Sequence, residues 1–335
     1  MNAPAIEARG LVKDFGDNRA VDGVDLDVAT GAIYGVLGPN GAGKTTTIKM
    51  LATLLSPDTG SARVFGHDVV REAHTVRSLI GLTGQYASVD DDLSARENLV
   101  LFGRLLGLGI RGAKAKADAL LEEFALTDAA TRPLKKFSGG MRRRLDLAAS
   151  LIAQPPLIFL DEPTTGLDPR TRLQMWDTIR RLVAEGSTVL LTTQYLDEAD
   201  QLADRIAVID RGRVVAEGTA DDLKRSVGTQ SLHLTVASHG FGHDEPSGPV
   251  DRTRTAIREL TGQEAVLTPM SGGARLTVPL DSASAVSDLL VRLRTAGVEV
   301  RELSMSEPTL DEVFLALTGH GAEEPDERIL EEVHA

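Results

Sequence analysis

The stretch Gly38–Thr46, GPNGAGKTT, constrains the fold of this chain more than any other. It follows the apolar run Ile33–Leu37, which is typical of a buried strand, and leads into Thr47–Leu55, whose apolar residues recur on one helical face. A glycine-rich loop between a strand and a helix, ending in Lys44 and Thr45, is the pattern of a phosphate-binding loop. Glycine lets backbone N–H groups turn toward phosphate oxygens, and the start of the helix favours negative charge. A chance glycine-rich turn would not place strand and helix in register, so the sequence predicts a nucleotide site.

Within this loop two side chains carry chemistry of their own. We expect Lys44 to reach the β- and γ-phosphates of the nucleotide, and the Thr45 hydroxyl to bind Mg²⁺. The residues expected to contact the nucleotide here are Gly38, Pro39, Asn40, Gly41, Ala42, Gly43, Lys44, Thr45 and Thr46.

Two carboxylates, Asp161 and Glu162, follow the apolar run Leu157–Leu160. Carboxylates at the end of a buried strand are costly unless a metal or a base role holds them. Asp161 suits Mg²⁺ bound through water, and Glu162 suits the polarisation of an attacking water molecule. The alternative is an acid pair that caps a helix before Pro163.

Strands alternate with helices after the phosphate loop, which predicts an α/β fold with a mainly parallel sheet. Alternating residues on both sides of Gly16–Asn18 predict an antiparallel pair of strands, and Ser94 with Glu97 predicts a capping box at a helix start. The expected strands are 5–12, 21–28, 60–65, 78–83, 157–160, 188–192, 206–210 and 213–217, and the expected helical segments are 93–150, 170–185 and 196–203.

A change of pattern near residue 225 predicts a second domain at 229–319. Its expected order, β-α-β-β-α-β, is that of a ferredoxin-like α+β domain. The expected strands are 231–237, 264–268, 274–279 and 298–303, the helices 251–261 and 282–296, a loop 238–250, and a last helix 309–318. That last helix carries an apolar stripe, which packs either on its own domain or on another subunit. We expect the acidic tail at 320–335 to be disordered.

Composition narrows the function. A length of 335 residues suggests two domains, and the absence of cysteine excludes disulfides and cysteine-based metal sites. No stretch is apolar enough to span a membrane or to act as a secretion signal. A formal net charge of −13 disfavours nucleic acid as a partner. We take the local basic clusters, Lys135–Lys136 and Arg142–Arg144, as solvated or phosphate-facing surface.

The segment Phe137–Leu145, FSGGMRRRL, makes the pattern specific, because Ser-Gly-Gly opens a helix and offers a second anion site. With the other motifs it resembles the ATP-binding subunits of ABC transporters, over roughly residues 5–225. The resemblance implies roles for further positions. Phe15 would stack on adenine, and Gln85 would touch Mg²⁺ and face a membrane partner. Ser138, Gly139 and Gly140 would contact nucleotide, and Asp161 with Glu162 would be the Walker B pair. Gly166–Pro169 would link two subunits, and Gln194 would take the place of the switch residue that contacts the γ-phosphate.

Two positions depart from the family pattern. The signature ends in Met141 instead of the usual Gln, and the switch is Gln194 instead of the usual His. Gln can donate a hydrogen bond to the γ-phosphate but carries no positive charge. The segment Thr192–Asp210 and the C-terminal segment Glu307–Gly319 are similar to the daunorubicin-resistance subgroup of bacterial drug exporters, where this Gln is familiar.

The resemblance implies an ABC ATPase domain at 1–228, with a mixed β-sheet core, an antiparallel β-subdomain and a helical subdomain at about 86–150. It implies hydrolysis of ATP with Mg²⁺, catalysed by Lys44, Glu162 and Gln194, with the metal held by Thr45, Gln85 and Asp161. We expect a homodimer at the cytoplasmic face of the membrane, bound to a separate multi-span permease and exporting a drug-like amphipathic compound or a lipid. The alternative is a soluble, non-transport ABC ATPase with a regulatory role, and GTP remains open as the nucleotide.

Overall fold

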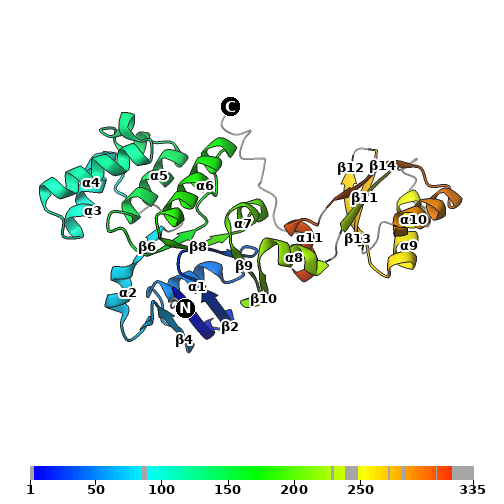
Figure 1. The fold of residues 1–335 in the computed structure, drawn as a ribbon, viewed down its shortest axis with the longest axis horizontal. Helices are drawn as coiled ribbons and strands as arrows, with labels where there is room; N and C mark the ends of the chain where they lie inside the picture. The colour runs from blue at the N-terminus through cyan, green and yellow to red at the C-terminus, as the bar shows by residue number, and fades with distance from the viewer. Residues whose placement is uncertain are drawn as a thin grey trace. The chain divides into compact units, whose positions relative to one another are not determined.

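The computed structural model describes residues 4–83, 89–227, 230–237, 248–270, 272–280, 284–306 and 308–318. The chain divides into two compact units, one ending at Ala220 and one beginning at Asp221 (Figure 1). Gln85, most of the expected loop at 238–250 and the expected tail at 320–335 lie outside the described residues.

A six-stranded mixed sheet forms the centre of the first unit, in the order β10-β9-β3-β8-β7-β6. Five of its strands are parallel to their neighbours, and only β10 pairs antiparallel, with β9. Every residue of β3, β7 and β8 is buried, as expected for parallel strands covered on both faces. The strands are β3 (Ile33–Leu37), β6 (Ile80–Thr83), β7 (Leu157–Asp161), β8 (Thr188–Thr193), β9 (Arg205–Asp210) and β10 (Arg213–Gly218).

A second, antiparallel sheet has the order β2-β1-β4-β5. Its inward-facing residues alternate with exposed ones and form one apolar cluster with α1 and the central sheet, including Tyr34, Met50 and Phe159. The mixed core sheet and the antiparallel sheet confirm the predicted α/β architecture. The elements are β1 (Ile6–Phe15), β2 (Asn18–Val28), α1 (Lys44–Leu51), β4 (Thr59–Val64) and β5 (His67–Asp68).

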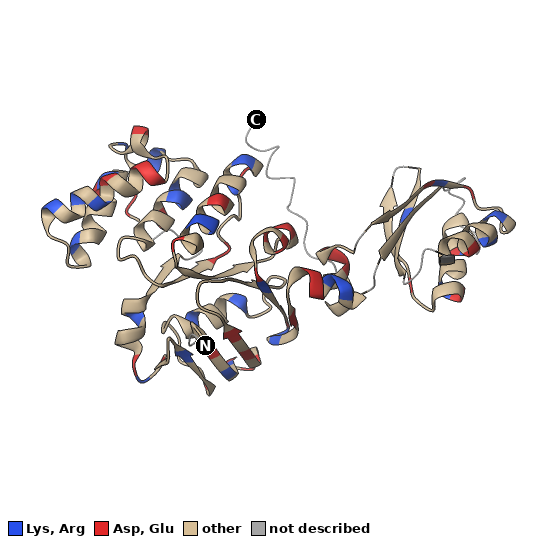
Figure 2. Ribbon diagram, viewed as in Figure 1, with Lys and Arg blue, Asp and Glu red and all other residues tan. Residues whose placement is uncertain are grey.

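The segment predicted to be helical contains α3, α4 and α5. Lys and Arg are spread along α3 and α4 (Figure 2). Ser94 Oγ accepts from Glu97 N, and Ser94 N donates to Glu97 Oε2 at 2.8 Å, so the predicted capping box is present. The strand expected from residue 78 was placed too early. It begins at Ile80, because Ser78 and Leu79 end a short helix, α2, that buries only Val76 and so has almost no apolar periodicity. The helices are α2 (Ala73–Leu79), α3 (Ala95–Leu105), α4 (Ile110–Glu123), α5 (Gly139–Ser150), α6 (Pro169–Ala184) and α7 (Leu196–Leu202).

The second unit has an antiparallel sheet in the order β12-β13-β11-β14. This is the strand order of a ferredoxin-like domain, which confirms the prediction. Its core joins Leu232, Leu276 and Val278 of the sheet to Ile257 of α9 and Leu289 of α10. The elements are β11 (Gln230–Ala237), α9 (Pro249–Thr261), β12 (Val266–Met270), β13 (Gly273–Leu280), α10 (Ser284–Thr295), β14 (Val300–Ser306) and α11 (Leu310–Thr318), with α8 (Ala220–Val227) at the division between the units.

The last helix, α11, is held to this domain's sheet. Glu312 accepts a hydrogen bond from Ser231 of β11 and lies 3.9 Å from His233 Nε2. Of its apolar stripe, Leu310, Val313 and Phe314 are buried in the single chain, and Leu317 is exposed. This burial favours packing within the chain over docking on another subunit.

No helix among the residues that the structure describes is long and apolar enough to cross a membrane.

Candidate functional site

Three of the predicted motifs meet where neighbouring parallel strands end. Gly38, after β3, donates its N–H to Thr193 O of β8 at 3.4 Å, and Glu162, after β7, donates its N–H to Thr192 O at 3.1 Å. The phosphate loop, the acid pair and the switch position Gln194 therefore lie at one edge of the sheet. This edge is where open α/β sheets bind their ligands.

The phosphate loop needs glycine at its turning points. Gly41 has φ 81° and Gly43 has φ 104°, a backbone region that other residues rarely adopt. A Cβ at Gly38 would lie 2.3 Å from Ile209 O, and one at Gly43 would lie 2.4 Å from Ala20 O. Both the backbone dihedral angles and the lack of space for a Cβ atom therefore require glycine at positions that the sequence pattern predicted.

Lys44 is held inside this loop and is only 4% exposed. Its Nζ donates to Gly38 O at 2.7 Å and to Pro39 O at 3.0 Å, and it lies 3.7 Å from Glu162 Oε1. Gly43 supplies no side-chain cap to α1, so the first N–H groups of the helix point at the loop without a capping side chain. A buried ammonium beside a helix start without a capping side chain is the arrangement that binds anions.

Asp161 gathers two hydroxyl groups beside the loop. Its Oδ1 accepts from Thr192 Oγ1 at 2.6 Å and from Thr45 Oγ1 at 3.1 Å. Carboxylate and hydroxyl oxygens are ligands that Mg²⁺ prefers. Among the described residues no group of three or more His, Cys, Asp or Glu could hold a metal ion. The residues present thus fit Mg²⁺ bound mainly by phosphate oxygens and water, as is usual for nucleotide sites.

Glu162 occupies a strained turn. Its φ of 49° is left-handed, which is costly for a residue with a Cβ and is often found at functional positions. The carboxylate is about 10% exposed, and Oε2 accepts from Thr165 Oγ1 at 3.3 Å. Glu162 caps no helix, because the next helix, α6, has Asp168 as its N-cap. The alternative of a helix-capping acid pair is therefore wrong for this residue.

Arg143 of α5 holds this turn from behind. Its Nη2 donates to Asp161 O at 2.6 Å and to Glu162 O at 2.8 Å, and its Nε donates to Pro163 O at 3.1 Å. Burial lowers the pKa of Arg143, although its carboxylate neighbours oppose that shift. The sequence placed Arg143 among solvated or phosphate-facing residues, and this was wrong. Its position four residues before the buried Leu147, on the same face of α5, was the signal for an inward-facing side chain.

Replacing Arg143 should therefore slow the ATP hydrolysis that the resemblance implies more than it weakens nucleotide binding. Arg143→Met leaves three carbonyls of the Glu162 turn without their donor, and misplacement of a catalytic group by about 1 Å costs on the order of 10²-fold in rate. Arg143→Lys keeps one donor and should recover part of the rate. Steady-state kcat and KM check this, with Arg180→Met on the exposed face of α6 as the matched control. Equal rates for Arg143→Met and the control would contradict the role.

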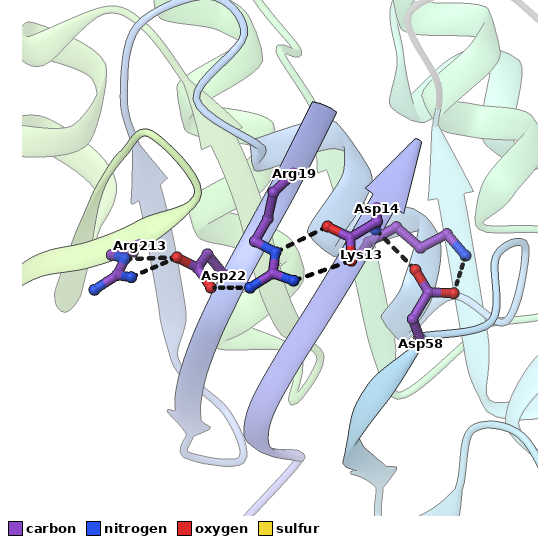
Figure 3. Close-up of polar contacts among 6 residues, drawn as sticks. All are labelled: Lys13, Asp14, Arg19, Asp22, Asp58 and Arg213. Carbon is purple, nitrogen blue, oxygen red and sulfur yellow. Dashed lines mark hydrogen bonds and ion pairs between the residues drawn. The ribbon is translucent and has the colours of Figure 1, made fainter. Parts of the chain in front are cut away.

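Phe15, the predicted adenine-stacking residue, ends β1 and is 50% exposed. Lys13 Nζ lies 5.8 Å from the centroid of its ring. Two ion pairs lie near it: Arg19 of β2 with Asp14 of β1 at 2.8 Å, and Lys13 of β1 with Asp58, just before β4, at 2.7 Å (Figure 3). Because the charged groups of these pairs are partly exposed to solvent, we expect each pair to add little stability.

A further ion pair and backbone hydrogen bonds connect these strands to the phosphate loop through the turn between β9 and β10. Arg213 pairs with Asp22 at 2.6 Å and holds the pKa of that carboxyl below its usual range (Figure 3). Gly212 N donates to Ala42 O at 2.9 Å, and Gly212 O accepts from Asp22 N at 2.8 Å. The strand pair that carries Phe15 is thus joined to the phosphate loop by backbone hydrogen bonds.

Gln194 follows β8 directly. Its Oε1 is buried and has no hydrogen-bond partner among the residues that the structure describes. Buried polar atoms without partners are rare in folded proteins and usually face a ligand or a water molecule. Four residues further along the chain, the buried Glu198 of α7 accepts from Thr164 Oγ1 at 2.9 Å and from Trp176 Nε1 at 3.1 Å, and burial raises the pKa of its carboxyl.

The signature segment forms a second helix start. Ser138 is the N-cap of α5, and its Oγ accepts from Met141 N at 3.3 Å. Gly139 faces open space, whereas a Cβ at Gly140 would lie 2.7 Å from Thr171 Cγ2. Met141 packs against the apolar core. In the described part of the chain no hydrogen bond joins Ser138–Gly140 to the phosphate loop, so one chain presents the two anion sites without linking them.

Comparisons with known proteins show which family the chain resembles along its length. The family model "ABC transporter" matches residues 21–165, and "ATP-binding protein DrrA1-3-like, C-terminal domain" matches residues 218–318. The daunorubicin/doxorubicin resistance ATP-binding protein DrrA of Streptomyces peucetius is 54% identical over 98% of this chain and 96% of its own length. The Nod factor export ATP-binding protein I of Ralstonia nicotianae is 36% identical over 95% of each chain. A solved ATP-binding subunit of an ABC transporter superposes with a TM-score of 0.60 at 28% identity, covering 66% of this chain and 92% of that one.

Proposed function

Because this chain belongs to the ATP-binding ATPase subunits of ABC transporters, in the daunorubicin-resistance group, we propose that it drives export of a drug-like amphipathic compound or a lipid. The export path belongs to a separate multi-span permease, which holds the subunit at the cytoplasmic face of the membrane. The observation that carries the proposal is the likeness over nearly the whole chain to proteins named for drug resistance and for export. A soluble regulatory ATPase is the second candidate, and no specific contact in the chain favours it.

The proposed chemistry uses two contacts of the described site, Lys44 with Glu162 and Thr45 with Asp161, together with Phe15 and Gln85. Lys44 and the loop N–H groups bind the β- and γ-phosphates of ATP, and Phe15 stacks on the adenine. Glu162 polarises the attacking water, and the strained turn that carries it is held by Arg143. Thr45 and Asp161, with Gln85, would hold Mg²⁺, which neutralises charge on the phosphates.

The proposed active unit is a homodimer. Ser138, Gly139 and Gly140 of one copy would cover the nucleotide held by the phosphate loop of the other, because a second helix start can bind the exposed side of the γ-phosphate. ATP then binds the closed dimer more tightly than the open one, and this difference in affinity moves the permease. Hydrolysis removes the difference and reopens the dimer.

Gln194 should contribute to hydrolysis through a neutral hydrogen bond. Gln194→Ala is expected to lower kcat by about tenfold, the effect of losing roughly one hydrogen bond to a charged group. Gln194→His should retain activity. Because an amide does not titrate, the ratio of the wild-type rate to the Gln194→Ala rate should stay constant between about pH 6 and pH 8. If Gln194→Ala has the wild-type kcat, the Gln194 side chain makes no contact that hydrolysis needs.

The experiment for the proposed function is co-expression of this chain with a candidate multi-span permease from the same genome. We expect the two to co-purify, and cells that make both to accumulate less daunorubicin than cells that make either alone. Glu162→Gln should abolish the difference in accumulation. If this chain purifies without any membrane protein and its loss changes no efflux, the regulatory candidate replaces the exporter.

A further inference from the structure

The hairpin of α3 and α4 carries an unusual surface at its closed end. The two helices approach closely, since a Cβ at Gly103 would lie 3.0 Å from the Cβ of Ala113. They bury Leu99 and Ala117 against the core of the unit. The end of α3, the connecting loop and the first turn of α4, residues 101–114, extend beyond that core, and we call them the hairpin tip (Figure 1).

Large apolar side chains of the hairpin tip are open to solvent. Leu105 is 73% exposed, Ile110 is 59% exposed and Leu106 is 54% exposed. A single exposed leucine is ordinary, but several within six residues form a patch, and such patches usually mark an interaction surface.

The charge around these residues has the opposite sign to the rest of the protein. Residues 98–117 contain four basic residues and no acidic ones, in a chain with a formal net charge of −13. Arg104, Arg111 and Lys114 are exposed. Among the described residues none of these three forms an ion pair with a carboxylate, whereas Arg96, nearer the core, pairs with Asp118 at 2.8 Å. The positive charge at the hairpin tip is therefore available to a partner (Figure 2).

Exposed leucines interleaved with unpaired Arg and Lys fit one kind of partner best. Such a surface buries its apolar side chains at the boundary of lipid headgroups and acyl chains, while the long basic side chains reach the anionic headgroups. A protein partner would have to place carboxylates and an apolar surface at positions that match a loop and two helix ends. Anionic lipid at a bilayer surface needs no such geometry.

We propose that the hairpin tip binds directly to an anionic bilayer surface, with Leu105 and Ile110 inserted at the headgroup boundary. This rests on the proposed role at a membrane, but it adds a contact that needs no permease. The contact would keep the subunit at the membrane while the dimer opens and closes.

The test is co-sedimentation of the purified full chain with vesicles of phosphatidylcholine alone, or of phosphatidylcholine with phosphatidylglycerol. We expect binding to the anionic vesicles only, weakened by salt. Leu105→Ser with Ile110→Ser should weaken it at least tenfold, since each exposed leucine-sized side chain gains roughly that factor on burial. Arg111→Glu with Lys114→Glu should also weaken it, because each basic residue near an anionic surface adds about fivefold. The matched control is Val70→Ser with Arg71→Glu, an exposed apolar and basic pair outside the hairpin.

Vesicle binding and ATP hydrolysis are measured separately, so the membrane contact is tested independently of the proposed ATPase function. ATP hydrolysis by the same samples reports on the proposed function, and we expect the hairpin variants to retain it. Wild-type protein that does not bind anionic vesicles would overturn the proposal. Hairpin variants that bind these vesicles as tightly as the control variant would also overturn it. Binding only to vesicles that contain the permease, lost in Leu105→Ser with Ile110→Ser, would overturn it in favour of a protein contact.

Discussion

Glu162→Gln is expected to lower the rate of ATP hydrolysis on the order of 10²–10⁴-fold while ATP still binds. Removing a general base costs about this factor, and glutamine keeps the size and hydrogen-bonding shape of the side chain. The strained backbone at Glu162 and its support by Arg143 remain in the variant, so the fold of the site should not change. Single-turnover hydrolysis of radiolabelled ATP and an equilibrium binding measurement check the two halves of this expectation.

The control for Glu162 is Glu185→Gln, a change of the same kind at the C-terminal end of α6, away from the phosphate loop. It should hydrolyse ATP at the wild-type rate. A Glu162→Gln protein that turns over ATP as fast as this control would assign the base to another group. Loss of both binding and hydrolysis in Glu162→Gln would mean that the residue mainly supports the loop.

Lys44→Ala is expected to weaken ATP binding by on the order of 10²-fold or more. The ammonium is buried and already forms short hydrogen bonds within the loop, and contacts between a buried cation and phosphate are among the strongest polar contacts. Isothermal titration calorimetry with ATP measures the effect. Lys49→Ala serves as the control, because Lys49 lies on the same helix but is exposed.

Truncation of the Lys44 side chain should also cost some stability without nucleotide. Gly38 O and Pro39 O lose their donor, which destabilises by about 1–3 kcal/mol when the carbonyls are buried. A modest fall in Tm together with lost binding fits this account. Unchanged affinity for ATP would contradict the assignment of Lys44 to the phosphates.

Local patterns explain what the sequence could predict. The phosphate loop, the buried strands β3, β7 and β8, and the individual strands and helices of the ferredoxin-like domain all depend on residues within a few positions of one another. The capping box of α3 is another local pattern. Such features follow from dihedral preferences and apolar periodicity, so the chain predicts them without knowledge of its tertiary contacts.

The support of the site could not be predicted in this way. Arg143 contacts carbonyls some twenty residues away, and the β9–β10 turn reaches the phosphate loop through Gly212, about 170 residues along the chain. Nothing in the spacing of the basic residues distinguishes Arg143 from Arg142 and Arg144, except the face of α5 on which it lies. The roles of Gln194 and Phe15 stay predictions, and Gln85 lies outside the described residues.

The most direct test of the account is sedimentation velocity of the Glu162→Gln protein with and without ATP and Mg²⁺. If each nucleotide is bound between two copies of the chain, the protein should be a monomer without nucleotide. It should form dimers with two bound ATP molecules when ATP is added. Adding Ser138→Arg to Glu162→Gln should abolish the dimer while one ATP still binds each monomer, because the second anion site is then blocked in the partner. Monomers in saturating ATP, or dimers that form equally well with Ser138→Arg, would contradict the proposal that two copies share each nucleotide.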